Sequence, residues 1–419
     1  MFKFIHAADI HLDSPLRGLA RYEGAPVERI RGATREAFKN LIELTMSEEA
    51  DFLLIAGDLY DGDWKDYNTG LFFAFQMTRL REAGIKVFLV TGNHDATSQI
   101  SRQLRVPDNV VRFSSRKPQT VVLDHLGVAI HGQGFGKAAV TEDLSAAYPS
   151  AVPGLFNIGA LHTSATGREG HEPYAPCTID GLIAKEYDYW ALGHVHKREI
   201  LCRDPFIVFP GNIQGRHIRE TGVKGCTVVS VDAGRIKMVE HRPLDVLRWC
   251  SKQLDASELD SPEEVLDLAA AAIREELDCA DGCLLAVRLQ IGGVSRAHSD
   301  LVLQAGRWTS EIRMAATDIS GGSVWIEKII IQTQSRSNLD EMIKRDDAIG
   351  GLLRSIQQLS AESREFDELL DQFSEFLRRL PPELQHGDEA IDIQEPATRR
   401  QIIEDVKQIL VGRLLAQGS

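Results

Sequence analysis

The stretch Phe4-Ile5-His6-Ala7-Ala8-Asp9-Ile10-His11 joins a short apolar run to an aspartate and a histidine that could bind a metal ion. The same arrangement, an apolar run followed by a polar cluster, recurs four more times along the chain. The later clusters are Gly57-Asp58, Gly92-Asn93-His94-Asp95, Leu161-His162-Thr163 and Gly193-His194-Val195-His196. Runs this short that end in glycine or polar residues are typical of buried strands. Because open α/β sheets place their sites at the carboxyl ends of strands, we expect the five clusters to converge.

The residue types in these clusters suit a pair of divalent cations. Two cations roughly 3.5–4 Å apart can activate a water and hold both oxygens of an in-line phosphoryl displacement. Such a pair needs a bridging carboxylate, and we predict Asp58 for that place. The terminal ligands predicted for one ion are Asp9, His11 and His196, and those for the other are Asn93, His162 and His194. Imidazole-rich ligand sets favour Mn, Fe or Zn over Mg or Ca.

Two histidine placements need a separate interpretation. His194 and His196 lie two residues apart, so on an extended strand end they would point the same way. In a turn they would diverge toward the two ions, which is the interpretation we prefer. His94 directly follows Asn93. If Asn93 binds an ion, His94 can act on the phosphate as a general acid or electrostatic stabiliser rather than as a ligand.

Taken together, the motifs resemble those of the calcineurin-like metallophosphoesterase superfamily, D-x-H, G-D, G-N-H-(D/E), H and G-H-x-H. Every element occurs in order over residues 9–196. Three further segments resemble bacterial DNA-repair exonucleases of the SbcD type, and within them the YhaO-like branch. They are Ala7-Ala8-Asp9-Ile10-His11-Leu12-Asp13-Ser14-Pro15, Glu172-Pro173-Tyr174-Ala175-Pro176-Cys177 and Pro210-Gly211-Asn212-Ile213-Gln214-Gly215-Arg216-His217. The resemblance covers residues 1–245 well and the remainder only in outline.

The resemblance implies cofactors, partners and additional site residues. The cofactors are two divalent metal ions, with Mn²⁺ as the expected identity, and the substrate is DNA. By analogy with dimeric relatives, a homodimer is expected. Some relatives carry a histidine three residues after the bridging aspartate; here that position is Asp61, so the role of that histidine is not carried over. Asp61 is then either a support for the ligands or a simple turn residue. Asp61, Arg216 and His217 are the candidates for contacting the substrate.

Composition limits the class of protein. The chain has 419 residues, and this length is more than one core usually holds, so we expect two or three units. With 43% hydrophobic residues the chain can bury a large core. It contains no run of about 20 apolar residues, which argues against a membrane span. The beginning of the chain lacks the charged and then apolar pattern of a leader, so a cytoplasmic location is expected.

The formal net charge of −14 argues against a protein that coats nucleic acid. It does not exclude a nuclease, because several acids would be metal ligands and two divalent cations add positive charge where a phosphate would sit. Local basic residues either follow a nucleic-acid backbone or belong to an ordinary solvated surface. They are Arg102, Arg105, Arg112, Arg116 and Lys117 in one group and Arg216 and Arg219 in the other.

Residues 1–245 are predicted to form one α/β catalytic domain. Apolar residues at helical spacing predict helices near 27–45 and 68–83, between strand motifs. This βαβαβ order is that of a layered α/β fold. The segments 226–231 and 235–240 predict a β-hairpin, which we expect to close the domain on its second sheet. With the resemblance, the expected fold is a layered metallophosphoesterase β-sandwich flanked by helices.

Residues 246–335 are predicted to form a small α+β domain. It combines a helix near 262–276 and a helical stretch near 297–314 with strands near 284–291 and 323–331. In the exonucleases that the chain resembles, such a domain is a cap over the active site that helps to select and guide DNA. Without that resemblance it would be only an accessory domain.

Residues 336–419 are predicted to form a helical C-terminal region, because apolar stripes recur near 339–356, 366–380 and 402–414. These helices either pack on each other or supply a last helix that docks on a partner helix. The resemblance favours docking on a coiled-coil ATPase of the SbcC or YhaN kind. With 17 acidic and 11 basic residues after Gln334, the region does not look like a DNA-binding arm.

Three functions therefore remain open at the level of sequence. The first is a metal-dependent DNA exonuclease, with or without endonuclease activity, that is the nuclease subunit of an SMC-like ATPase complex in DNA repair. The second is a phosphoesterase of the same fold that acts on a small molecule or a phosphoprotein. A phosphoprotein substrate is disfavoured because the segment 57–63 lacks the Arg-Gly that usually follows in Ser/Thr phosphatases. The third is a scaffold with structural metals, which the complete ligand set opposes.

Overall fold

A computed structural model describes residues 1–14, 26–61, 67–97, 106–165 and 174–335, together with short stretches after 335, the longest of which is 395–403. The described chain divides into two compact units. The first comprises Met1–Cys250, Cys279–Val287 and Ser323–Glu327, and the second comprises Ser251–Asp278, Arg288–Gly322 and Lys328–Ser419. The predicted domain boundaries at 245 and 335 stay a prediction.

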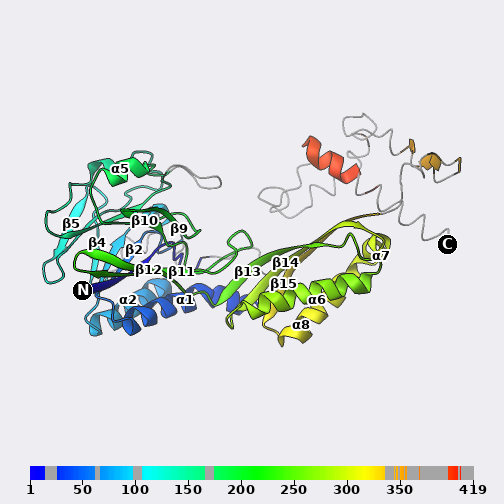
Figure 1. Cartoon of the computed structure of the whole chain (residues 1–419), viewed down its shortest axis with the longest axis horizontal. Helices are drawn as coiled ribbons and strands as arrows, with labels where there is room; N and C mark the ends of the chain where they lie inside the picture. The colour runs from blue at the N-terminus through cyan, green and yellow to red at the C-terminus, as the bar shows by residue number, and fades with distance from the viewer. Residues whose placement is uncertain are drawn as a thin grey trace. The chain divides into compact units, whose positions relative to one another are not determined.

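Two six-stranded sheets form the central layers of the first unit (Figure 1). The first sheet has the order β12-β11-β1-β2-β3-β4, and the second has the order β5-β6-β7-β8-β10-β9. The strands of the first sheet are β1 Phe2–Ala7, β2 Phe52–Ala56, β3 Lys86–Val90, β4 Val110–Arg112, β11 Gly225–Asp232 and β12 Arg235–Pro243. Those of the second are β5 Gln119–Leu123, β6 Val128–Gln133, β7 Phe156–His162, β8 Tyr189–Gly193, β9 Glu199–Arg203 and β10 Phe206–Phe209.

The apolar runs of the sequence form strands that are buried on both faces. In β1, Phe4 points into the core between the two sheets, whereas its neighbour Ile5 points into the core on the other face of the first sheet. A strand covered on both faces has no polar alternation, which explains why these segments are continuous apolar runs. β1, β2, β3 and β4 are parallel to one another, as are β6, β7 and β8. Their carboxyl ends therefore lie at the same edge of each sheet.

Helices cover the outer faces of the sandwich. α1 (Val27–Ser47) and α2 (Tyr67–Glu82) pack together on the first sheet, as the apolar stripes predicted (Figure 1). α5 (Ile179–Ile183) and the short 3-10 helix η2 (Leu144–Ala147) contact each other, and apolar residues of both join the outer core of the second sheet. One further short helix, α3 (Asn93–Thr97), begins directly after β3. The layered α/β sandwich flanked by helices is thus confirmed.

The predicted hairpin is present, but the prediction of its sheet was wrong. β11 and β12 pair antiparallel around the turn at Ala233 and Gly234. β11 then pairs with β1, from Phe2 opposite Val231 to His6 opposite Thr227, so the hairpin extends the first sheet and not the second. The local signals of a hairpin specify its turn and register, whereas its neighbour depends on which strand edge is open in the tertiary fold.

A three-stranded sheet, β13-β14-β15, follows in the chain and contributes residues to both units. Its strands are β13 Leu247–Asp255, β14 Leu284–Ser295 and β15 Val324–Ser335, and the helices between them are α6 Pro262–Asp278, α7 His298–Leu303 and α8 Ala305–Ser320. The sequence predicted β14, β15 and the helical segments but missed β13. At the start of α6, Ser261 Oγ accepts from Glu264 N and the Glu264 carboxylate accepts from Ser261 N, which is a capping box.

Most of the predicted C-terminal helical region lies outside the described residues. Within the described part, residues 396–403 are helical. The predicted stripes near 339–356 and 366–380 are described at too few positions to be tested. Among the residues that the structure describes, no helix is both long enough and apolar enough to span a membrane.

Candidate metal centre

All seven predicted ligands lie at or just beyond the carboxyl ends of five strands. Asp9 and His11 follow β1, Asp58 follows β2, Asn93 follows β3, His162 ends β7, and His194 and His196 follow β8. The structure brings the acidic and imidazole ligands into overlapping groups whose ligand atoms lie within 4.8 Å of one another. The first group is Asp9, His11 and His196, the second group is Asp58, His162 and His194, and a middle group of His11, Asp58 and His94 shares a residue with each of these two outer groups. The clusters therefore converge as the strand order predicts, and the metal-binding roles of their residues stay a prediction.

Four of these residues have a strained backbone. Asp9, His11, Asp58 and His194 have φ angles of 50°, 46°, 50° and 101°, in the left-handed region that residues other than glycine rarely adopt. Such conformations persist only where the surroundings impose them, and they gather at functional sites. Here backbone hydrogen bonds hold them: Asp9 N donates to Gly57 O at 3.0 Å, and His11 N donates to Asp58 O at 3.0 Å. The loops after β1 and β2 thus fix each other.

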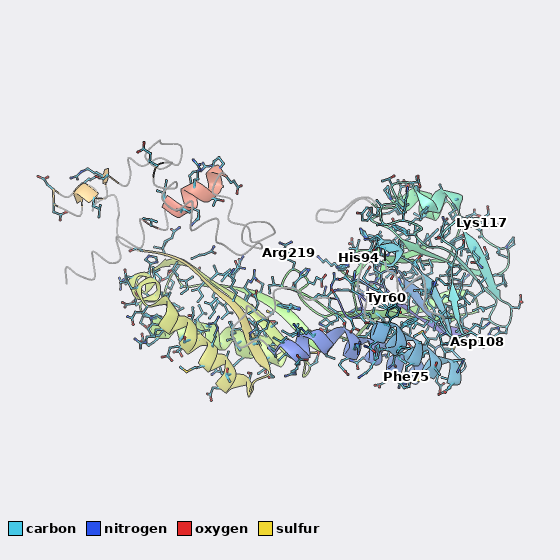
Figure 2. All side chains as sticks on the ribbon, turned by 180° about the vertical axis from the view of Figure 1, so that it is seen from behind. Tyr60, Phe75, His94, Asp108, Lys117 and Arg219 are labelled. Atoms are coloured by element: carbon cyan, nitrogen blue, oxygen red, sulfur yellow. The ribbon has the colours of Figure 1, made fainter. Side chains whose placement is uncertain are left out.

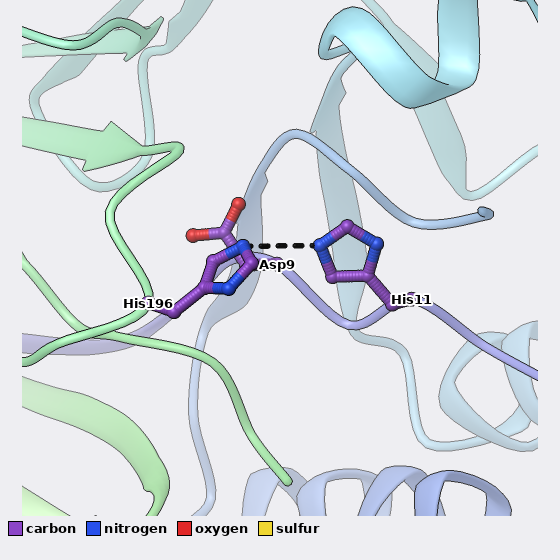
Figure 3. A group of neighbouring side chains, drawn as sticks. All are labelled: Asp9, His11 and His196. Atoms are coloured by element: carbon purple, nitrogen blue, oxygen red, sulfur yellow. Dashed lines mark hydrogen bonds between the residues drawn. The ribbon is translucent and has the colours of Figure 1, made fainter. Parts of the chain in front are cut away.

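The first group joins Asp9, His11 and His196 (Figure 3). The Nε2 atoms of the two imidazoles face each other at 3.2 Å. The Asp9 carboxylate lies beside them and accepts from the backbone N of His194 at 3.0 Å through both oxygens. Two imidazole nitrogens and a carboxylate that point at one small space form a donor set typical of transition-metal sites.

The second group gathers around His162. Its Nδ1 donates to the carbonyl of Ala56 at 3.0 Å, so Nε2 is the nitrogen that faces the cluster. That Nε2 lies 2.9 Å from Asn93 Oδ1 and 3.4 Å from Asp58 Oδ2. His194 belongs to this group and His196 to the first, so the two histidines diverge as preferred from the sequence.

Asp58 lies between the two groups. Its Oδ2 is 3.4 Å from Nε2 of His162 and 3.9 Å from Nε2 of His11, while its Oδ1 accepts from the backbone N of His94 at 3.0 Å. Burial would raise the pKa of Asp58, but the charge of His162 and its hydrogen bond outweigh burial and hold that pKa well below its ordinary value. One carboxylate oxygen shared by the two groups is the geometry that a bridging ligand requires.

His11 provides a test of whether this arrangement fits a cation. Its Nε2 faces His196 Nε2 at 3.2 Å and Asp58 Oδ2 at 3.9 Å. Its Nδ1 is buried, makes no hydrogen bond among the described residues and lies 3.7 Å from Asp61 Oδ1. Burial and the charge of Arg216 lower the pKa of His11 to about 3, so the ring is neutral, which is the form that binds metals. The facing imidazole of His196 and the carboxylates of Asp9 and Asp58 then suit a cation, and the residues present fit a pair of divalent ions.

The glycines that precede the ligands are required by close packing. A Cβ on Gly57 would lie 2.3 Å from His162 Nδ1, one on Gly92 would lie 2.2 Å from Asp58 Oδ1, and one on Gly193 would lie 1.9 Å from the Ala56 carbonyl oxygen. These distances are far inside van der Waals contact. The Gly-Asp, Gly-Asn-His-Asp and Gly-His-Val-His motifs thus need glycine so that the ligands of neighbouring loops can approach one another.

We expect Gly92→Ala to weaken metal binding although it removes no ligand. The new methyl group would displace the Asp58 carboxylate or the His162 ring, its two nearest side chains. A shift of about 1 Å in a ligand should lower Mn²⁺ affinity by at least tenfold, as disturbed ligand supports do. Isothermal titration calorimetry with Mn²⁺ measures this. The matched control is Gly32→Ala in α1, where a Cβ meets nothing within 4 Å and should stabilise the helix by up to about 1 kcal/mol. Unchanged affinity in Gly92→Ala would contradict the expectation.

His94 differs from the ligands in exposure and partner. Its side chain is 40% exposed, and its Nδ1 donates to Asp61 Oδ1 at 2.8 Å. Burial alone would lower the pKa of His94, but the hydrogen bond to Asp61 and the charge of Asp58 raise it. Its ring centroid lies 4.9 Å from that of His11. A partly exposed imidazole held by a carboxylate next to the ligand cluster can donate a proton to a bound substrate.

The structure assigns Asp61 more contacts than a turn residue needs. Besides His94, its carboxylate accepts from the Ser14 hydroxyl and lies 3.7 Å from the Arg216 guanidinium. Arg216 is largely buried beside the first group, whereas the His217 side chain is 53% exposed. Of the three candidate substrate contacts, Asp61 and Arg216 therefore border the cluster directly.

The predicted basic groups differ in position. Arg102 and Arg105 lie outside the described residues. Figure 2 shows Lys117 well separated from His94, so this basic residue lies away from the candidate ligands. Arg216 lies next to it, with NH2 3.4 Å from His196 Nδ1. The group that follows β10 is therefore the one that borders the candidate centre.

Two carboxylates at the centre were missed in the sequence. Asp95 is buried and accepts from the backbone N atoms of Leu59, Tyr60 and Gly92 at 3.2, 2.9 and 3.0 Å, so it ties the loop after β2 to the loop after β3. Glu220 is buried and accepts from Nδ1 of His196 at 2.7 Å. Asp95 stands in the Gly-Asn-His-Asp motif, which was a usable signal, whereas Glu220 stands 24 residues from His196 with no motif to connect them.

Comparisons with known proteins agree with this geometry. The family model Calcineurin-like phosphoesterase matches residues 2–198, and the model Metallophosphoesterase YhaO, middle domain matches residues 249–334. The chain is 34% identical to the metallophosphoesterase YhaO of Bacillus subtilis (strain 168) over 366 residues, which cover 85% of this chain and 87% of that protein.

Two more distant relatives are DNA double-strand break repair proteins Mre11. The protein of Methanopyrus kandleri is 28% identical over 61% of this chain and 59% of its own length. The protein of Sulfurisphaera tokodaii is 24% identical over 54% of this chain and 60% of its own length. The family match, the extended identity to YhaO and the metal-ligand groups agree, so the chain belongs to the calcineurin-like phosphoesterase family, within its YhaO-like branch, and is a metal-binding hydrolase of phosphoesters.

Proposed function

We propose that the protein is a two-metal DNA nuclease that hydrolyses phosphodiester bonds in DNA repair. The observation that carries this proposal is the position of Asp58 Oδ2 between His11 and His162, with the partly exposed His94 beside it. This arrangement offers two adjacent ion sites and a proton donor, which is what in-line phosphoryl displacement needs. DNA as the substrate is supported by the two relatives named as DNA double-strand break repair proteins.

In the proposed reaction the chain's own residues bind the metal ions, orient the His94 ring and donate a proton. Asp9, His11 and His196 would hold one ion, Asn93, His162 and His194 the other, and Asp58 both. When bound, two divalent ions, with Mn²⁺ as the proposed identity, polarise phosphate oxygens and activate the attacking water. Asp61 orients the His94 ring through Nδ1, so that Nε2 can donate a proton to the leaving oxygen. The Arg216 guanidinium, alongside the first group, would pair with a phosphate oxygen.

We expect added Mn²⁺ to stabilise the protein strongly. An ion that binds only the folded state at 100 times its Kd adds about 2.7 kcal/mol, and two ions add about twice that. For a unit of this size each ion should raise Tm by roughly 5–10 °C. Differential scanning calorimetry of chelator-treated protein with and without Mn²⁺ measures the shift. Ca²⁺, which prefers oxygen-rich sites, should produce a smaller one. Equal Tm values with and without Mn²⁺ would contradict a two-ion centre.

The proposed substrate is tested with purified protein and end-labelled linear DNA in Mn²⁺. Asp58→Asn is assayed alongside, and p-nitrophenyl phosphate esters serve as competing substrates. DNA degradation that disappears in Asp58→Asn supports the nuclease. Turnover of the small esters with DNA intact, in the presence and absence of an ATPase partner, would replace it by the alternative, a phosphoesterase acting on a small-molecule phosphodiester or phosphomonoester.

The partner and the domain roles are part of the same proposal. We assign residues 1–245 to catalysis, 246–335 to a cap that guides DNA, and 336–419 to docking on an SbcC- or YhaN-like coiled-coil ATPase, in a cytoplasmic complex with a dimeric nuclease. A truncation that ends at residue 335 should keep Mn²⁺ binding and lose ATPase association in a pull-down with the purified ATPase. Retained association would exclude the C-terminal region as the docking element.

A further inference from the structure

Glu220 is a buried carboxylate in the loop between β10 and β11, ten residues after Pro210. Its side chain is 6% exposed. Burial would raise its pKa, but the hydrogen bond from His196 and the charge of Arg216 outweigh burial and hold the pKa well below its ordinary value. A charge in this environment persists only if its partners are well placed.

Four donors surround the two oxygens of Glu220. Oε1 accepts from His196 Nδ1 at 2.7 Å and from Arg216 NH2 at 3.1 Å. Oε2 accepts from the backbone N of Arg216 at 2.8 Å and from Asn212 Nδ2 at 2.9 Å. The carboxylate therefore connects a predicted metal ligand, a candidate phosphate contact and the loop that carries the latter.

The contact with His196 determines how that ring faces the metal centre. A carboxylate at Nδ1 requires the proton on that nitrogen, so Nε2 keeps its lone pair. Nε2 is the atom that lies 3.2 Å from His11 Nε2 in the first group (Figure 3). Carboxylates that bind the outer nitrogen of a metal-binding imidazole fix its tautomer and orientation and raise its basicity.

The contact with Arg216 fixes a cation at the border of the centre. Its guanidinium lies between the Glu220 carboxylate, at 3.1 Å, and Asp61 Oδ2, at 3.7 Å. Asp61 in turn binds His94 at 2.8 Å. Glu220 therefore holds both a ligand of the first group and a positive charge that faces the same space.

We propose that Glu220 is a positioning residue that sets the Nδ1–H tautomer of His196 for metal binding and holds the Arg216 guanidinium toward the substrate phosphate. The inference rests on the proposed two-metal centre. The loop itself has other supports: Lys224 Nζ and the backbone N of Asn212 donate to the His196 carbonyl at 3.1 and 3.3 Å. Substitution of Glu220 should therefore disturb the side chains of His196 and Arg216 more than the backbone.

The test is the Mn²⁺ affinity of Glu220→Gln in the full-length protein, measured by titration calorimetry without substrate. The amide has nearly the same size, but it replaces one of the two acceptor oxygens by an NH2 group that donates. Some of the four donors around Glu220 must therefore lose their partner. We expect Mn²⁺ affinity to fall about 10–100-fold, as for other supports of metal ligands. For Arg216→Gln we expect a raised KM for a diester substrate. We expect no loss of Mn²⁺ affinity, because removing the positive charge of a side chain does not weaken the binding of a metal cation.

The matched control is Asp245→Asn. Asp245 is also a buried carboxylate that pairs with a neighbouring arginine, Arg248, at 3.0 Å, but it belongs to none of the metal-ligand groups that the described residues form. Both variants lose a buried ion pair, so a general loss of stability would affect both. Only Glu220→Gln should change Mn²⁺ affinity. If the two variants lower the affinity equally, Glu220 acts through stability alone and the inference is overturned.

A second measurement does not depend on the variant's folding. Nitrogen-15 NMR of selectively labelled wild-type protein reports the tautomer of each histidine, with His196 assigned from a His196→Gln variant. We expect a proton on Nδ1 of His196; a proton on Nε2 in the metal-free protein would overturn the inference. Failure of the wild-type protein to bind Mn²⁺ would overturn the metal centre and this inference together. Glu220-dependent Mn²⁺ binding without DNA cleavage would retain the inference and remove only the DNA substrate.

Discussion

Asp58→Asn should abolish metal binding and hydrolysis together. The asparagine keeps the shape of the side chain but removes the negative charge, and its one carbonyl oxygen cannot both bridge two ions and accept from the backbone N of His94. Metal ions supply several kcal/mol of transition-state stabilisation, and each 1.36 kcal/mol is a tenfold change in rate. Loss of the pair should therefore lower kcat by at least about 10³-fold, with Mn²⁺ stoichiometry by calorimetry reduced in parallel.

Asp188→Asn is the control for this prediction. Asp188 precedes β8 at the opposite end of that strand, where its carboxylate accepts from the backbone N of Asn157 at 2.7 Å. It should keep wild-type metal stoichiometry and turnover. If Asp58→Asn retains turnover, Asp58 does not bridge the ions, and the shared position of its Oδ2 between His11 and His162 must have another meaning.

His94→Gln should keep both metal ions and lose most turnover. The ring bonds to Asp61 rather than filling a ligand position in the two outer groups, and its side chain is 40% exposed. Loss of a general acid typically costs about 10²–10⁴-fold in rate. Steady-state hydrolysis of the diester that the wild-type enzyme cleaves measures kcat, and calorimetry measures bound Mn²⁺.

Two features make this prediction discriminating. His94 also lies in a group with His11 and Asp58 whose ligand atoms are within 4.8 Å, so loss of an ion in His94→Gln would make it a ligand instead of a proton donor. An exposed histidine in the turn after β5, His125, supplies the control, and His125→Gln should leave both stoichiometry and kcat unchanged. Full turnover in His94→Gln would remove His94 from the mechanism.

Asp61 shows what the tertiary structure adds to a motif. In the sequence it was open whether this residue supports the ligands or only forms a turn. The structure places its carboxylate between His94, Ser14 and Arg216, with the His11 ring nearby. These partners come from three separate segments of the chain, after β1, β3 and β10, and no spacing along the chain relates the segments. The carboxylate can therefore orient His94, although it replaces the histidine of some relatives.

The sequence by itself determined the strands that carry the candidate ligands, the β11–β12 hairpin, β14, β15 and the main helices. Apolar runs such as Phe4–Ile5 are buried on both faces, and the helical stripe of α1 faces a sheet, so local patterns suffice to identify them. The convergence of the candidate ligands could be predicted because each stands at the carboxyl end of a strand, and parallel strands end at one edge. The distances between them depend on glycines at 57, 92 and 193, whose need for close approach becomes visible only once the loops are packed.

Only the tertiary structure decided which sheet the β11–β12 hairpin joins, that β13 is a strand, and that Asp95 and Glu220 support the centre. The physical reason is the same in each case. Strand neighbours and buried carboxylates are selected by partners far away in the chain, as Glu220 is by His196 and β11 is by β1. A local pattern reports how a segment buries its own side chains, but not which distant group completes its hydrogen bonds.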